Sequence, residues 1–259
     1  MLDYLAQLFS EPPAFFDQAI FRMLAVLIGL CCHEWGHAYA AYRCGDDTAK
    51  RMGRLTLNPL AHLDPIGTLL MFFAGFGYAK PVPVNPWNFR GDRRKCDLVV
   101  SLAGITINIA LFVLFTFAAA AGSLFLWERE VVEYYGLSML LDYHYNVIWE
   151  VIDGTAAETF GVLVARPMLV PFVRLCAYTA LVNLNLAVFN LIPLPPLDGY
   201  HVFNDLLLKG RLHLSERAFR IGMLLVLYLS YRGILGKIIS AAVYPSQNLL
   251  LWPIRLIWG

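Results

Sequence analysis

Residues 20–42 read IFRMLAVLIGLCCHEWGHAYAAY, an apolar run that carries His33, Glu34 and His37 in its second half. A helix that crosses a membrane needs about 20 mostly apolar residues, and this run is long enough. An ionisable side chain at the centre of a bilayer costs about 2.5–3.5 kcal/mol on insertion scales, so such residues tend to be functional. The run therefore predicts a membrane helix that contains a functional polar site.

The pentapeptide HEWGH at 33–37 has the spacing of a zinc site. On a helix, positions i and i+4 lie on one face about one turn apart, so the two imidazoles can bind the same ion. Glu34 follows the first histidine, where a carboxylate can act as general base. The alternative is that both histidines are hydrogen-bonded core residues and that Glu34 is neutral.

Two histidines do not complete such a site, because a catalytic zinc ion takes three protein ligands and keeps one position open. We expect the third ligand to be Asp198, which lies in NLIPLPPLDG at 190–199. The prolines of this motif should end the preceding helix on its cytoplasmic side, and Gly199 should allow a sharp turn. The motif therefore predicts a carboxylate on an irregular stretch at the membrane edge.

The remainder of the chain is also suited to lipid. Of its 259 residues, 59% are hydrophobic and only 15% are charged, with a mean hydropathy of +0.59. A soluble domain carries about 25% charged residues. The net charge of +1 offers no field to hold a polyanion, which argues against a nucleic-acid partner. The five cysteines have neither zinc-knuckle nor disulfide-framework spacing.

Further apolar runs lie at 98–126, 175–197, 221–231 and 238–252. The last two could form one kinked span, two short spans or interfacial helices. We therefore expect an all-α polytopic membrane protein in which a three-helix catalytic core is followed by C-terminal helices. With little length left for a second domain, residues 1–259 should form a single integral-membrane domain.

Residues 65–79 are uncharged but too short to cross a membrane easily, and they continue into KPVPVNP at 80–86. Alternating prolines and valines favour extended backbone and oppose helix. Extended backbone at this depth must be buried in protein or line a wet cavity. We expect a short β-hairpin at the membrane edge.

Loop charge predicts the orientation. Residues 43–95 contain nine Lys and Arg side chains and residues 209–220 contain four, whereas residues 122–167 contain two basic and seven acidic side chains. The positive-inside rule places the basic segments in the cytoplasm. The insert at about 122–167 and the N-terminus would then be extracytoplasmic, and the active site would lie near the cytoplasmic side of the cell membrane.

Taken together, these motifs resemble the site-2 protease family of intramembrane zinc metalloproteases (peptidase M50). The resemblance rests on the motifs at 33–37 and 190–199, and NPLAHLDPIGT at 58–68, the 80–86 segment and AGITIN at 103–108 reinforce it. Family members often have proline where this chain has Ile105. The motifs cover most of residues 20–210.

The resemblance implies that His33, His37 and Asp198 bind one Zn²⁺ per chain and that Glu34 is the general base. The implied substrate is a single-span membrane protein, cleaved in or near its transmembrane segment within the lipid bilayer, as in regulated intramembrane proteolysis. The sequence does not define the oligomeric state.

The resemblance also implies roles for three other residues. Asn108 would lie near the site and help to position the substrate or its developing oxyanion. Asn58 and His62 would shape the loop beneath the active site, although His62 could equally cap that loop.

Two other functions use the same groups. A membrane metal-ion transporter would need polar residues along a continuous path through several helices, whereas here they cluster at one depth. A proteolytically inactive binding scaffold would not require the intact motif at 33–37 together with Asp198.

Overall fold

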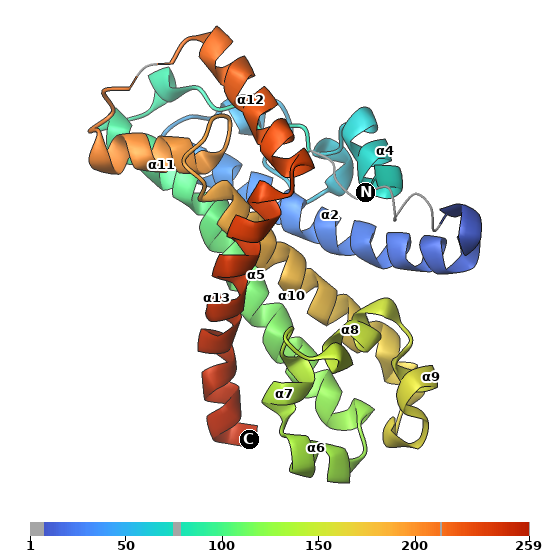
Figure 1. Cartoon of the computed structure of the whole chain (residues 1–259). Helices are drawn as coiled ribbons and strands as arrows, with labels where there is room; N and C mark the ends of the chain where they lie inside the picture. Colours follow the sequence, from blue (N-terminus) through green and yellow to red (C-terminus); the bar gives the residue numbers. More distant parts are fainter. Residues whose placement is uncertain (1–7, 75–78, 213, 259) are drawn as a thin grey trace.

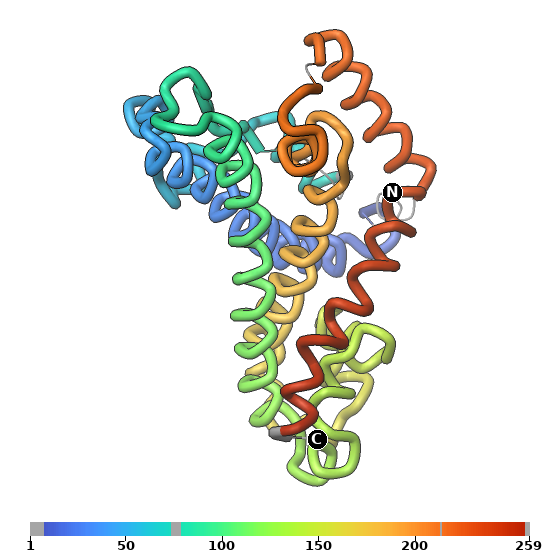
Figure 2. Tube along the Cα trace, turned by 90° about the vertical axis from the view of Figure 1, so that its left-hand side faces the viewer, coloured from blue at the N-terminus to red at the C-terminus, as the bar shows by residue number. Residues whose placement is uncertain are grey.

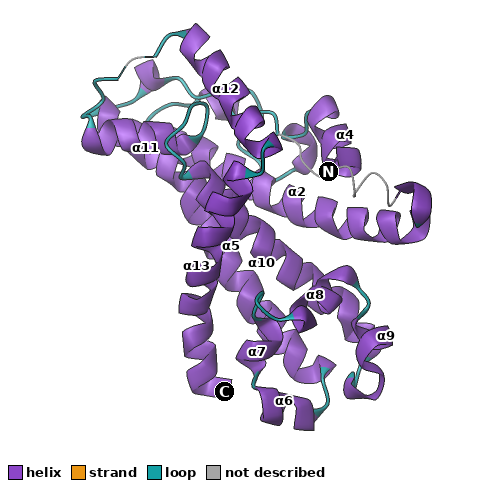
Figure 3. Ribbon diagram, in the orientation of Figure 1, coloured by secondary structure: helices purple, strands orange, loops and turns teal. Residues whose placement is uncertain are grey.

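The computed structural model describes residues 8–74, 79–212 and 214–258, and within them the regular structure is helical (Figure 3). Three helices are long and apolar enough to cross a membrane: α2 (Pro12–Arg43), α5 (Arg93–Leu126) and α10 (Val170–Asn190). Helices α5 and α10 run side by side, and α2 lies across them and packs against both (Figures 1 and 2). The prediction of an all-helical chain with three apolar core helices is confirmed.

Small residues allow α2 to approach its two neighbours closely. A Cβ atom at Gly36 would lie 2.5 Å from Ile107 Cδ1 of α5, and one at Gly29 would lie 2.9 Å from Leu186 Cδ1 of α10. Close backbone approach at small residues is the usual basis of helix association in lipid, where van der Waals packing replaces the hydrophobic drive. The crossing is therefore tight at the level of the predicted site.

Helix α10 ends at Asn190, seven residues before the end of the predicted span, and a short loop leads into α11 (Asp198–Leu207). Asp198 does not lie on an irregular stretch, as the sequence suggested, because it is the first residue of α11. A carboxylate is favoured there by the helix dipole. A Cβ at Gly199 would lie 2.4 Å from the backbone of Leu191, so this glycine permits close packing rather than an unusual turn.

Two C-terminal helices complete the chain, α12 (Glu216–Tyr231) and α13 (Ile234–Trp258). They meet at a bend of 76°, and together they could count as a fourth, broken span. The part of the chain that the structure describes therefore has three candidate spans, or up to four.

The predicted membrane-edge β-hairpin is wrong. Residues 65–74 form the short helix α4 (Pro65–Ala74), residues 75–78 lie outside the described part of the chain, and only an isolated bridge joins Leu63 to Ala79. Residues 80–85, here called the edge segment, form no helix and pair with no strand among the described residues, and Asn85 has extended dihedral angles. The prolines of the edge segment have no N–H to donate to a neighbouring strand. The N–H groups of Val82 and Asn85 bond to carboxylates of Glu34 and Asp46 instead.

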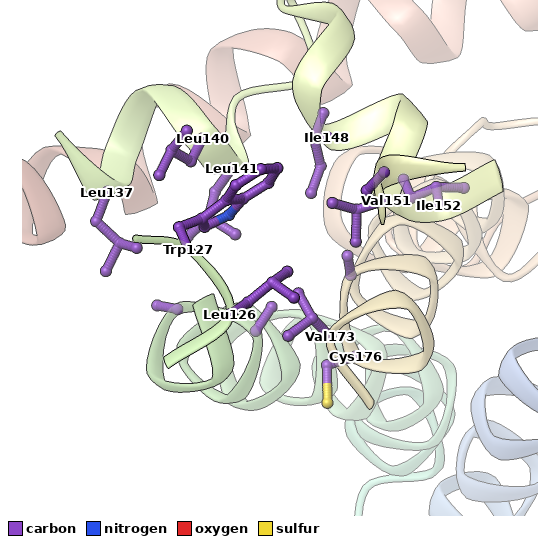
Figure 4. Packing of buried hydrophobic residues seen from close by; sticks show 14 of the residues in the cluster. Leu126, Trp127, Leu137, Leu140, Leu141, Ile148, Val151, Ile152, Val173 and Cys176 are labelled. Atoms are coloured by element: carbon purple, nitrogen blue, oxygen red, sulfur yellow. The ribbon is translucent and has the colours of Figure 1, made fainter. Parts of the chain in front are cut away.

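The insert forms four short helices: α6 (Arg129–Tyr135), α7 (Leu137–Leu141), α8 (Asn146–Asp153) and α9 (Ala156–Phe160). They lie at the ends of α5 and α10 that are remote from α11 (Figure 1). Figure 4 shows Leu126 and Trp127 meeting Val151 of α8 and Val173 of α10 in one buried cluster. The insert is therefore a packed cap on these two helices.

Candidate metal centre

His33 and His37 of α2 meet Asp198 of α11 at one point. The two Nε2 atoms are 2.9 Å apart, and Asp198 Oδ2 lies 3.3 Å from His33 Nε2 and 3.2 Å from His37 Nε2. Atoms that bind zinc tetrahedrally at 2.0–2.2 Å lie about 3.3–3.6 Å from one another. The three predicted ligands are therefore brought together at nearly the separations that one small ion requires.

The hydrogen bonds of the two imidazoles direct lone pairs toward this point. His33 Nδ1 lies 2.6 Å from Asn108 Oδ1, and His37 Nδ1 lies 2.7 Å from Val100 O. Both oxygens can only accept, so each Nδ1 carries the hydrogen and each neutral imidazole presents a lone pair at Nε2. Asp198 Oδ2 is buried and has no hydrogen-bond partner among the described residues. A single divalent cation would satisfy all three atoms, and two imidazoles with one carboxylate suit zinc.

A chain of buried amides lies behind His33. Asn108 is fully buried, and its Nδ2 donates to Asn183 Oδ1 at 2.7 Å and to Gly29 O at 3.3 Å. Asn183 Nδ2 donates in turn to Thr179 O at 2.8 Å. These bonds fix the direction of both amides, so Asn108 Oδ1 faces His33. The chain joins α2, α5 and α10 through one continuous set of hydrogen bonds.

Asn108 therefore contacts a candidate metal ligand rather than the wall of the cavity. Its predicted role in positioning substrate stays a prediction, and its contacts support a role in orienting His33. Sequence reasoning missed Asn183. An amide inside an uncharged apolar span was the available signal, but the neighbouring Asn185 and Asn190 gave the same signal.

Gly104 of α5 faces the two imidazoles. A Cβ atom at this position would lie 2.5 Å from His37 Nε2 and 2.6 Å from His33 Cε1. The absence of a side chain at Gly104 thus creates the space in which the histidine rings meet.

Glu34 and the three candidate ligands line one cavity of about 390 Å³. Val82 of the edge segment, which forms part of the wall, donates its N–H to Glu34 Oε2 at 2.8 Å. The buried side chain of Arg54 holds the edge segment from the other side, since its Nη2 donates to Lys80 O at 2.6 Å. The general base predicted from the sequence is thus held by an extended segment next to the candidate metal site.

Asn58 and His62 are not among the residues that line this cavity. Asn58 Oδ1 accepts from Leu60 N at the start of η1 (Pro59–Ala61). His62 is buried, its Nε2 donates to Thr56 O at 2.7 Å, and its carbonyl accepts from Lys80 N at 2.8 Å. These contacts fold the loop that precedes the edge segment, which supports the predicted loop-shaping role.

Comparison with known proteins identifies the family of this chain. The model of peptidase family M50 matches residues 21–230. The relatives that the chain matches include two with the printed name "Putative zinc metalloprotease". YwhC of Bacillus subtilis is 34% identical over 233 residues, which cover 90% of this chain and 84% of YwhC. Rip2 of Mycobacterium tuberculosis is 30% identical over 237 residues, which cover 88% of this chain and 74% of Rip2.

No solved structure matches the chain significantly. The family model nevertheless covers most of the sequence. It includes both halves of the candidate metal centre, all of α5 and α10, and α2 from residue 21 onward. The chain is therefore an integral membrane protein that belongs to peptidase family M50.

Proposed function

We propose that this chain is an intramembrane zinc metalloprotease that hydrolyses peptide bonds in or near the membrane-spanning segments of other membrane proteins. The observation that carries the proposal is the meeting of His33, His37 and Asp198 in one cavity with Glu34. The membership of the M50 family and the zinc metalloprotease names of the relatives support the same activity.

His33, His37 and Asp198 would hold the zinc ion, which would supply Lewis-acid chemistry that activates a water molecule and polarises a peptide carbonyl. Glu34 takes a proton from the water as its oxygen adds to the carbonyl carbon, and then gives a proton to the amine nitrogen as the C–N bond breaks. The bond from Val82 engages Oε2 and leaves Oε1 for this proton. The amide chain keeps Nε2 of His33 directed at the metal position.

The substrate must be locally extended, because the carbonyl groups of a helix are already hydrogen-bonded. We infer that a single-span membrane protein unwinds beside the edge segment, whose extended backbone borders the cavity. Residues 43–95 and 209–220 are rich in Lys and Arg, and the positive-inside rule places such segments in the cytoplasm. We infer that the cavity opens toward the cytoplasm and that the N-terminus lies outside the cell membrane.

A comparison of membrane-protein fragments in cells tests the proposal. We expect the wild-type enzyme to generate fragments that are absent with Glu34→Gln, while purified Glu34→Gln retains one zinc per chain by elemental analysis. His33→Ala should lose both the metal and the fragments. Fragments that persist with Glu34→Gln, or a purified wild-type enzyme that binds no transition metal, would overturn the proposal.

A further inference from the structure

His201 lies one turn after Asp198 on α11 and lines the same cavity as Glu34. Residues three apart share a helix face, so the ligand and this imidazole point to the same side of α11. The ring of His201 is held in place by two aromatic neighbours, Tyr200 and Phe219 of α12, with ring centroids at 5.1 and 6.4 Å. An ordered imidazole therefore borders the candidate metal centre without belonging to it.

Asp97 of α5 determines which nitrogen of this ring is free. His201 Nδ1 lies 3.1 Å from Asp97 Oδ2, so the carboxylate accepts the Nδ1 hydrogen and leaves Nε2 without that partner. The same hydrogen bond raises the pKa of His201 above its ordinary 6.5 and outweighs the opposing effect of burial. In the imidazolium both ring nitrogens are donors.

Charged groups of α2, α5, α11 and the turn after α11 line the two cavities beside His201 or act on its ring. Acidic groups dominate, since Asp198 and Asp205 of α11 add to the effect of Asp97 and also favour the imidazolium. A second cavity of about 440 Å³ shares His201 with the first, and its lining includes basic side chains. The basic groups of the second cavity are Arg93 and Arg94 of α5 and Lys209 of the turn after α11. In the first cavity, α2 contributes the acidic group Glu34 and the imidazoles of His33 and His37.

We propose that His201 donates its Nε2–H to the carbonyl oxygen of the scissile peptide and stabilises the negative charge that develops there. The inference rests on the proposed protease function. No proton moves in this contact, since Glu34 carries the proton from the water to the amine nitrogen and the C–N bond breaks as described. Asp97 is a positioning residue that holds the imidazolium through Nδ1.

The variant His201→Phe tests this role, because it keeps an aromatic ring between Tyr200 and Phe219 but removes the donor. With a tagged single-span protein whose fragment depends on Glu34, kcat should fall about 10²–10³-fold, as for loss of one oxyanion donor. KM, zinc content and melting temperature should stay at wild-type values. His201→Gln, which retains an N–H donor, should recover part of the lost rate.

The matched control is His144→Phe in the insert. His144 Nδ1 bonds to Asp142 Oδ1 at 2.7 Å, which makes the same kind of histidine–carboxylate pair away from the cavity. This variant should cleave at the wild-type rate. A kcat for His201→Phe within threefold of wild type, or a loss of rate matched by a loss of zinc, would overturn the inference.

Asp97→Asn provides a readout that a purely structural contact would not move. The amide oxygen still accepts the Nδ1 hydrogen, but it no longer stabilises the positive charge, so the pKa of His201 should fall. The basic limb of the pH–kcat profile should therefore shift to lower pH, and an unchanged profile would contradict the proposal.

If wild type and Glu34→Gln give the same fragments, the protease function itself fails, whereas normal cleavage by His201→Phe refutes only the role of His201.

Discussion

Gly104 controls the space available to the two imidazoles of the candidate metal centre. Gly104→Ala should displace both rings, because the added Cβ would lie 2.5–2.6 Å from ring atoms. We expect zinc affinity, measured by chelator competition, to fall at least about tenfold, since a misplaced ligand weakens the metal site. Gly236→Ala in α13 is the control, because a Cβ there meets nothing within 4 Å. Equal zinc affinity in both variants would show that the two imidazole rings can shift to accept the added Cβ without losing the metal geometry.

The buried amides of Asn108 and Asn183 hold the imidazole of His33 in place. Asn183→Leu leaves Nδ2 of Asn108 without its best acceptor, and an unpaired buried donor costs about 1–3 kcal/mol. The melting temperature should fall, and zinc affinity should fall about 10–100-fold because His33 is less firmly oriented. Asn185→Leu, two residues along the same helix and half-buried, should retain wild-type affinity. Wild-type zinc affinity in both variants would contradict the proposed role of the Asn108–Asn183 hydrogen bond in orienting His33.

Asp46 lies in the turn after α2 and provides a test by pH. Burial alone would raise the pKa of Asp46, but hydrogen bonds from Asn85, Thr48 and Asn88 to the charged form outweigh it and hold the pKa below its ordinary 3.8. A depressed pKa adds stability above the unfolded-state pKa, and that stability is lost as the pH falls through the folded-state value. Asp46→Asn should therefore lower the melting temperature at pH 7, and the difference from wild type should shrink in acid. A difference in melting temperature that stays constant between pH 7 and acidic pH would contradict the depressed pKa of Asp46.

Part of the site could be predicted from the sequence and part could not. The spacing of His33 and His37 fixes their common face locally, because any helix places i and i+4 together. The direction of the Asn108 amide and its partner Asn183 depend on where two helices cross and on which rotamers fit there. Neither property is encoded in a single run of residues.

Among the elements, the edge segment shows the same division between local and distant information. Alternating prolines favour an extended backbone locally. Residues 80–85 form no helix, and Asn85 has extended dihedral angles. Whether such a segment pairs with another strand depends on donors elsewhere in the fold. Here Glu34, Asp46 and Arg54 take the hydrogen-bonding groups that a hairpin would have used.

A substitution at Val82 can remove the hydrogen bond between the edge segment and Glu34. Val82→Pro eliminates the N–H that bonds to Glu34 Oε2, while proline suits the extended conformation. We expect kcat to fall about tenfold or more with zinc content unchanged, because the base loses its fixed orientation. Val84→Pro, in the same segment, is the control and should retain activity. Equal rates in the two variants would show that the Val82 contact does not matter for catalysis.

For the whole molecule, hydropathy predicted the three apolar helices because membrane insertion depends mainly on composition. The way α2 crosses α5 and α10 was out of reach, since it follows from small residues on three separate helices that meet only in the folded chain. The orientation in the membrane rests on loop charge alone and stays a prediction.

Cysteine labelling tests this orientation in a background that lacks the native cysteines. Arg129→Cys in the insert and Arg51→Cys at the end of the short helix α3 (Thr48–Arg51) replace exposed side chains in an acidic and a basic segment of the chain. A membrane-impermeant maleimide should label Arg129→Cys in intact cells and Arg51→Cys only after permeabilisation. The reverse pattern would invert the orientation, and with it the side toward which cleaved fragments are released.

The two parts of the metal centre are synthesised at different times. His33, Glu34 and His37 leave the ribosome early, whereas Asp198 follows after a further stretch of about 160 residues. A nascent or prematurely terminated chain that ends before α11 lacks a complete ligand set, so it should be inert toward the neighbouring proteins that enter the bilayer at the same translocon. The separation of the ligands along the chain thus delays activity until translation of the core is complete.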